Sequence, residues 1–142
     1  MCTLDWVGRG RGAARVPARG VVTVPDGVEI SLDVMVTGSR KPADLSFLRQ
    51  LPADSITDLQ LDAPIRPESV AAVTHLAPGL RRLYLAWADL TDDALTHVSK
   101  LYGLTYLQSW GNRFTDRGVQ DVPFTGVELA ELRRRLPGVD IG

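Results

Sequence analysis

Apolar residues return along this chain at a fixed interval of 24 residues. Three windows share the pattern leucine-x-x-leucine-x-leucine, with one substitution in the first and one in the third: Ile56-x-x-Leu59-x-Leu61, Leu80-x-x-Leu83-x-Leu85 and Leu104-x-x-Leu107-x-Ser109. The alternation inside each window predicts a short, half-buried strand. A unit of this length cannot bury its apolar side alone, so we expect successive units to stack on one shared core.

A further strand is predicted upstream of the three windows. Val28, Ile30, Leu32 and Val34 alternate with polar residues, and Leu32 precedes Leu59 by 27 residues, close to the repeat interval. We interpret this segment as an irregular first repeat or cap. A helix is expected over residues 44–51, because the leucines there lie on one helical face and a proline follows them.

Helical patterns follow the first two windows. Residues 91–101 are the clearest case: Asp92 and Asp93 lie in the first turn, where the helix dipole favours carboxylates. Ala94, Leu95 and Val98 then form an apolar stripe. Residues 67–76 repeat this arrangement more loosely. The alternation of strand and helix predicts an α/β fold with a parallel sheet.

The unit after the strand also recurs, as Leu90-Thr91-Asp92-Asp93-Ala94-Leu95 and Phe114-Thr115-Asp116-Arg117-Gly118-Val119. Together with the strand windows, it resembles the bacterial leucine-rich repeat proteins with short, ribonuclease-inhibitor-like units, over residues 28–142. The resemblance implies a short solenoid, with a curved parallel sheet of four or five strands and helices on its convex side. It also implies that Asn112 caps the turn after its strand.

Two parts of the chain break the period. Residues 1–20 contain Gly8-Arg9-Gly10-Arg11-Gly12 and no apolar period, so we expect a disordered Arg/Gly-rich tail. The leucine-rich repeat domain then spans 21–142, with an irregular cap at 21–51 and repeats from residue 52. An irregular junction is expected at 114–123 and a C-terminal cap at 124–142, with a helix over 126–136. Because Phe124-Thr125 follows Phe114-Thr115 after only 10 residues, either whole repeats have been lost between Val119 and Gln120 or the loop is naturally irregular.

Composition narrows the functional classes. The formal net charge is −1, so no overall field favours a nucleic acid or an anionic membrane. Cys2 is the only cysteine, which excludes an intramolecular disulfide, and no apolar run has the length of a membrane span or signal peptide. We therefore expect a cytoplasmic protein. His75 and His97 belong to predicted outer helices and to no catalytic motif, so we expect no enzyme activity, metal or cofactor.

The residues between the strand leucines are expected to point away from the core and to form the concave face. Tyr84, Trp87, Tyr106 and Trp110 would lie on or beside neighbouring strands there, and aromatic residues and arginine are favoured at the centres of protein interfaces. The predicted partner-binding residues are Asp58, Gln60, Asp62, Arg81, Arg82, Tyr84, Trp87, Tyr106, Gln108 and Trp110. In the alternative interpretation, the two tryptophans fold over their own strand ends as turn packing.

The favoured function is a module that binds a protein partner through the concave face. One alternative is the substrate-recognition arm of an enzyme system such as a ubiquitin-ligase-like complex, although residues 1–27 are too short and polar for an adaptor domain. Another is nucleic-acid binding through the Arg/Gly tail, disfavoured because the tail has four arginines and one aromatic residue. A truncated remnant of a longer repeat protein is the third. The identity of the partner and the oligomeric state stay open.

Overall fold

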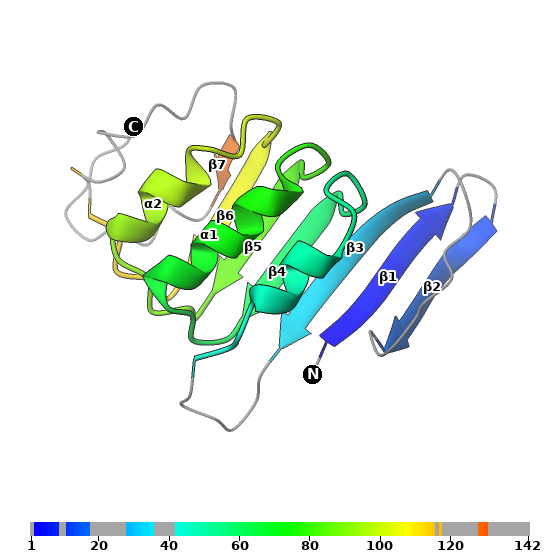
Figure 1. Ribbon diagram of the computed structural model, residues 1–142, viewed down its shortest axis with the longest axis horizontal. Helices are drawn as coiled ribbons and strands as arrows, with labels where there is room; N and C mark the ends of the chain where they lie inside the picture. Colours follow the sequence, from blue (N-terminus) through cyan, green and yellow to red (C-terminus); the bar gives the residue numbers. More distant parts are fainter. Residues whose placement is uncertain are drawn as a thin grey trace.

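The protein forms one mixed sheet with helices on one of its faces (Figure 1). The computed structural model describes residues 2–8, 11–17, 28–35, 42–115, 117 and 128–130, and the side chains of 28–35, 42–115 and 117. The sheet order is β2-β1-β3-β4-β5-β6-β7. The strands are β1 (Cys2–Gly8), β2 (Arg11–Pro17), β3 (Val28–Met35), β4 (Asp58–Asp62), β5 (Arg82–Ala86), β6 (Tyr106–Trp110) and β7 (Glu128–Ala130).

The leucine spacing sets the register of the parallel part of the sheet, which runs from β3 to β7. Leu59 pairs with Leu83, and Leu83 pairs with Leu107, so residues 24 positions apart lie side by side. All three side chains are fully buried. Since burying one leucine stabilises a fold by about 1.5–3 kcal/mol, this row is a main source of stability. The predicted α/β architecture with a parallel sheet is confirmed.

Helices cover the leucine-bearing face of β4, β5 and β6 (Figure 1). They are η1 (Ser46–Gln50), a continuous segment of η2 (Pro67–Ser69), α1 (Val70–Val73) and η3 (Thr74–Leu76), and then α2 (Asp93–Val98). Leu48, Val73 and Leu95 are fully buried against the strand leucines. The helix expected over 44–51 therefore forms as a shorter 3₁₀ turn.

Backbone contacts repeat with the same interval where the strands begin. The carbonyl of Thr57 accepts hydrogen bonds from the amides of Arg81 and Arg82, at 2.8 and 3.1 Å. The carbonyl of Arg81 accepts from the amides of Thr105 and Tyr106, also at 2.8 and 3.1 Å. Neighbouring units are thus joined outside the strands by matching backbone bonds, which satisfy polar groups at the edge of the core.

Asn112 ties two units together where the strands end. Its Oδ1 accepts from the amide of Leu90 at 3.1 Å, and its Nδ2 donates to the carbonyl of Leu85 at 3.0 Å. Nδ2 also lies 2.6 Å from Ser109 Oγ and 3.1 Å from the carbonyl of Trp110. The cap that the resemblance implied is therefore present. Ser109 is a buried polar residue in a leucine position, and Asn112 is its partner.

The prediction of a disordered tail over residues 1–20 is wrong for residues 2–8 and 11–17. These form β1 and β2, an antiparallel hairpin in which β1 also pairs with β3. The described sheet thus has seven strands, of which β3 to β7 form a parallel part of five, in agreement with the four or five parallel strands predicted. Leu4 and Trp6 pair by register with Leu32 and Ile30, so β1 repeats the alternation of β3. Pairing with a distant apolar strand stabilises a segment whose own composition favours disorder.

The predictions for the C-terminal end also need correction. Residues 128–130, expected in a helix, form β7, and Leu129 pairs with Leu107 across an interval of 22 residues. This interval is close to the others, and the loss of whole repeats would leave it unchanged, so both explanations of the irregular junction stay predictions. The recurring Phe-Thr pair suggested a shortened unit, whereas the pairing of β6 with β7 aligns the leucines. The rest of the junction (116 and 118–123) and of the cap (124–127 and 131–142) lies outside the described residues.

Candidate binding site

The strands β3 to β6 have one face that packs against the helices and one that does not. Side chains alternate along a strand, so the residues between the buried apolar positions share the second face. We call this the open face. It is formed by Glu29, Ser31, Asp33, Met35, Asp58, Gln60, Asp62, Arg82, Tyr84, Ala86, Tyr106, Gln108 and Trp110.

Near the strand starts, the open face carries an ion-pair cluster. Arg82 Nε donates to Asp58 Oδ1 at 2.8 Å, and Arg82 Nη2 lies 3.4 Å from Glu29 Oε2. Asp58 and Arg82 are register partners on β4 and β5, which explains the close approach. The hydrogen bond to Asp58, and then its negative charge, raise the pKa of Arg82 above its usual value. The charges of Arg82 and Asp58 are therefore paired within the protein.

Two tyrosines occupy the middle of the open face. The rings of Tyr84 and Tyr106 lie 5.5 Å apart at an angle of 47°, a tilted contact typical of aromatic pairs. The hydroxyl of Tyr106 donates to Gln108 Oε1 at 3.3 Å. Partial burial, followed by the nearby Asp58 carboxylate, raises the pKa of Tyr84 above its usual value. The two rings thus form an aromatic contact at the centre of the open face.

Beyond the tyrosines, near the strand ends, the open face is hollowed. The pocket has a volume of about 340 Å³. We call it the tryptophan hollow, and its walls are Gln60, Asp62, Tyr84, Leu85, Ala86, Trp87, Gln108 and Trp110. Its size lies at the lower end of the range of about 300–1,000 Å³ for ligand pockets in proteins.

Trp87 stands at the rim of the hollow in an unusual backbone conformation. Its φ is +52°, in the left-handed region that only glycine adopts at no cost. One repeat later, Gly111 has a φ of +63°, so the turn itself requires this conformation. The Trp87 amide donates to the carbonyl of Trp110 at 2.8 Å. Its ring lies over Gly111, where an added Cβ would stand 2.2 Å from Trp87 Cε3.

The structure brings six of the ten predicted binding residues together in the hollow: Gln60, Asp62, Tyr84, Trp87, Gln108 and Trp110. Tyr106, Asp58 and Arg82 lie nearer the strand starts. Arg81 does not contribute to the hollow, because its guanidinium faces the carbonyls of Leu80, Pro78 and Gly103 at 3.2–3.5 Å. Sequence reasoning missed Leu85 and Ala86 as walls, although their positions on β5 place them between the aromatic residues.

The packing of Trp87 differs from the alternative interpretation. Its ring packs on Gly111, in the turn of the next unit rather than over its own strand end, and 59% of its surface stays exposed. Trp110 is 37% exposed. A tryptophan that served only to pack on a turn would be buried more completely, because a large aromatic ring stabilises a fold through the surface that it buries. Both residues therefore keep part of their surface exposed.

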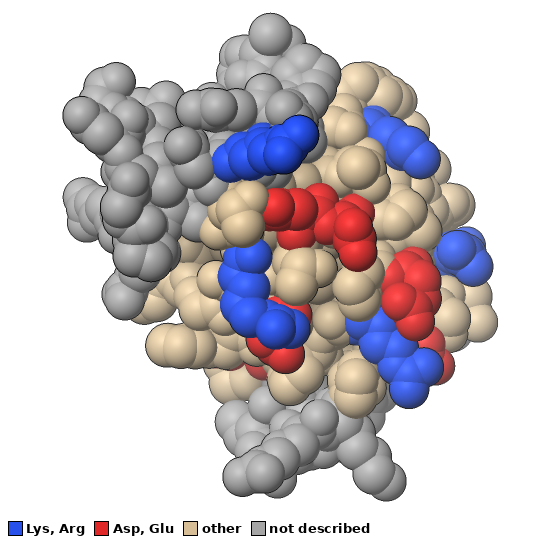
Figure 2. All heavy atoms as spheres, turned by 90° about the vertical axis from the view of Figure 1, so that its left-hand side faces the viewer, with Lys and Arg blue, Asp and Glu red and all other residues tan. Residues whose placement is uncertain are grey.

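The open face of β3 to β6 is acidic. It carries four carboxylates (Glu29, Asp33, Asp58 and Asp62) and one basic residue, Arg82. In contrast, acidic and basic side chains are interspersed at the end of the molecule drawn at the left of Figure 1, which faces the viewer in Figure 2. The negative excess therefore distinguishes the open face from that end.

Among the residues with described side chains, no group of three or more His, Cys, Asp and Glu is placed to hold a metal ion. None of the described helices has the length and hydropathy needed to cross a membrane. No protein-family profile, curated protein or solved structure matches this chain.

Proposed function

We propose that this chain is a short leucine-rich repeat module that binds a protein partner through its open face. In this proposal the open face is the concave side of a curved solenoid. The observation that carries the functional part is the tryptophan hollow, where two exposed tryptophans and several polar side chains meet on the sheet face opposite the described helices. No catalytic step or cofactor is part of the proposal.

The regular succession of units supports the repeat assignment. Leu32, Leu59, Leu83, Leu107 and Leu129 are successive register partners at intervals of 27, 24, 24 and 22 residues. The backbone bonds at the strand starts and the Asn112 cap recur between units or join them. Repeat intervals of 20–29 residues with a strand and a helical segment in each unit are typical of leucine-rich repeats.

The chemistry of the hollow supports a protein partner. Tryptophan and tyrosine are enriched among the few residues that supply most of the binding energy in protein interfaces. Here Trp87, Trp110 and Tyr84 surround one pocket, so an incoming side chain would contact all three. The amides of Gln60 and Gln108 add polar groups that fix orientation.

One alternative function has less support than the sequence suggested. Nucleic-acid binding was argued from a disordered Arg/Gly tail, but residues 2–8 and 11–17 pair within the sheet. A truncated remnant stays an alternative, because the loss of whole repeats would leave the interval between β6 and β7 unchanged. A substrate-recognition arm would use the same open face, so it is a special case of partner binding. The cytoplasm is our proposed location, because Cys2 has no cysteine within the chain to pair with.

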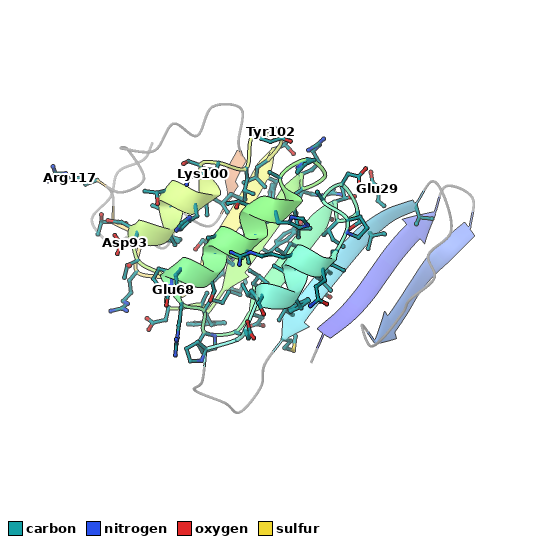
Figure 3. The ribbon with its side chains drawn as sticks, viewed as in Figure 1. Glu29, Glu68, Asp93, Lys100, Tyr102 and Arg117 are labelled. Carbon is teal, nitrogen blue, oxygen red and sulfur yellow. The ribbon has the colours of Figure 1, made fainter. Side chains whose placement is uncertain are left out.

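Affinity capture with a matched set of variants tests the proposal. Wild-type protein, the Trp87→Ala/Trp110→Ala double variant and Tyr102→Ala are each immobilised and exposed to lysate of the native host. Tyr102 is 76% exposed and follows α2, away from the hollow (Figure 3), so its replacement is the control. A captured protein is then purified and its affinity measured by calorimetry. We expect the double variant to bind at least tenfold more weakly and Tyr102→Ala to bind as wild type does.

A second variant keeps the test informative if the double variant fails to fold. Ala86→Gln adds a bulky, uncharged side chain to the wall of the hollow without removing any aromatic packing. We expect it to block the partner while its thermal melting stays close to that of wild type. Unchanged partner affinity in both the double variant and Ala86→Gln would overturn the proposal.

A further inference from the structure

We infer that the tryptophan hollow receives an arginine side chain from an extended segment of the partner. This inference rests on the proposed function and deepens it, because it names the chemistry of the side chain that is recognised. Three properties of the hollow carry it: its hydrogen-bond acceptors, its aromatic walls and the acidic surface around it.

The hollow contains hydrogen-bond acceptors. Asp62 lies on the wall of the hollow and, among the residues with described side chains, has no ion pair. This differs from Asp58 on the same strand, whose charge Arg82 already neutralises. Gln60 adds an amide oxygen next to it. An ionised carboxylate accepts hydrogen bonds only, so the group that satisfies it must be a donor.

The aromatic walls of the hollow favour a planar donor group. Trp87 and Trp110 both line the pocket, and an indole face attracts a cation more strongly than any other aromatic ring. A guanidinium is planar, stacks on aromatic faces and offers five N–H donors, two of which match a carboxylate in parallel. An ammonium is compact and more strongly hydrated, so it gains less from the same walls. The hollow therefore fits arginine better than lysine.

The surroundings favour a positively charged segment. On β3 to β6 the open face has more carboxylates than basic residues; Glu29 and Asp58 pair with Arg82, and Asp62 lies on the wall of the hollow. A concentrated negative field raises the association rate of basic partners and rejects acidic ones. Because the hollow lies at one end of the sheet face opposite the described helices, an extended segment can anchor its arginine there and continue across β5 and β4.

Selection from a random heptapeptide library displayed on phage tests this inference while the partner protein is still unidentified. The library is selected separately on wild-type protein and on Ala86→Gln, which narrows the hollow without changing its charge. We expect peptides that bind wild type and not Ala86→Gln, and we expect arginine to be enriched in them at one position. Hollow-dependent peptides without arginine enrichment would overturn the inference and leave the proposed function standing. Absence of any hollow-dependent peptide would overturn both.

The best selected peptide then serves as the probe for the charge contact. Replacing its arginine with citrulline, which keeps the shape and removes the charge, should weaken binding by about tenfold or more, since hydrogen bonds to charged groups are the stronger kind. Asp62→Asn should weaken the arginine peptide to a similar degree and leave the citrulline peptide almost unaffected.

The matched control is Asp89→Asn. Asp89 is also an exposed aspartate after β5, but it pairs with Arg113 at 2.8 Å and is not part of the hollow wall. Its φ of +55° suits asparagine well. We expect the affinity for the arginine peptide to change less than twofold. Equal losses in Asp62→Asn and Asp89→Asn would mean that only general charge matters, and would overturn the assigned contact.

Discussion

Replacing Asn112 with alanine removes the side chain that joins the end of β5 to the end of β6. The amide of Leu90 then loses its acceptor, and the carbonyl of Leu85 loses one donor. Leu90 and Leu85 are both buried, so water does not readily replace the missing partner. An unsatisfied buried donor or acceptor costs about 1–3 kcal/mol. We expect Asn112→Ala to lower the free energy of unfolding by about 2–4 kcal/mol.

Ser109→Ala is the matched control for this prediction. Asn112 Nδ2 has two hydrogens but three acceptors within 3.1 Å, namely Ser109 Oγ and the carbonyls of Leu85 and Trp110. Removing the serine hydroxyl therefore leaves both hydrogens with a partner. It also returns an apolar group to a core position of the leucine pattern. We expect the free energy of unfolding to change by no more than about 0.5–1 kcal/mol.

Urea unfolding followed by circular dichroism measures both variants. For a small protein the free energy of unfolding falls by about 1–3 kcal/mol per molar urea, so the Asn112→Ala midpoint should drop by about 1–2 M. Hydrogen exchange adds a local reading, because the Leu90 amide should exchange faster in Asn112→Ala. A loss below about 0.5 kcal/mol in Asn112→Ala, or equal losses in both variants, would refute the assigned role of the cap.

Four other outcomes are expected. Gly111→Ala should destabilise the fold by about 1–2 kcal/mol from the left-handed backbone alone, and shift the Trp87 fluorescence, because the new Cβ meets that ring. Trp87→Gly should be more stable in urea than Trp87→Ala by about 0.5–1 kcal/mol, the reverse of the usual order, because only glycine relieves the positive φ. Leu83→Ala should lower the free energy of unfolding by about 2–5 kcal/mol, and Tyr84→Ala by about 0.5–1.5 kcal/mol. Equal losses in the two variants would show that the assigned strand register is wrong. The raised pKa of Tyr84 gives stability that is present below about pH 10 and is lost as the pH rises through the folded-state value, so Tyr84→Phe should flatten the alkaline fall in stability.

The parallel half of the fold was predictable because its signal repeats. Leu59, Leu83 and Leu107 occupy equal positions in equal units, so a single correct strand assignment fixes the register of all three. Alternation then separates the buried face from the open face, and Tyr84 and Trp110 were placed correctly on the latter. Helical residues such as Leu95 followed from the apolar stripe.

The N-terminal hairpin was not predictable from the same reasoning. Its stabilising contacts join residues far apart in sequence, such as Leu4 with Leu32, and they appear only once. The partners of long polar side chains were also missed. Arg81 and Arg82 are neighbours of the same residue type, yet one faces backbone carbonyls and the other pairs with carboxylates. That choice depends on which groups lie within reach in three dimensions.

Trp87 has a backbone conformation that the fold does not require of a tryptophan. The turn after the strand requires a left-handed residue, and Gly111 meets this requirement one repeat later at no steric cost. A tryptophan in the same place costs about 1–2 kcal/mol of backbone energy and leaves 59% of its surface exposed to water. Folding alone therefore favours glycine at this position. Strained residues persist where function needs them, and this one forms the rim of a pocket that also contains Trp110 and Asp62. The glycine at position 111 belongs to the same arrangement, because any side chain there would occupy the space of the Trp87 ring.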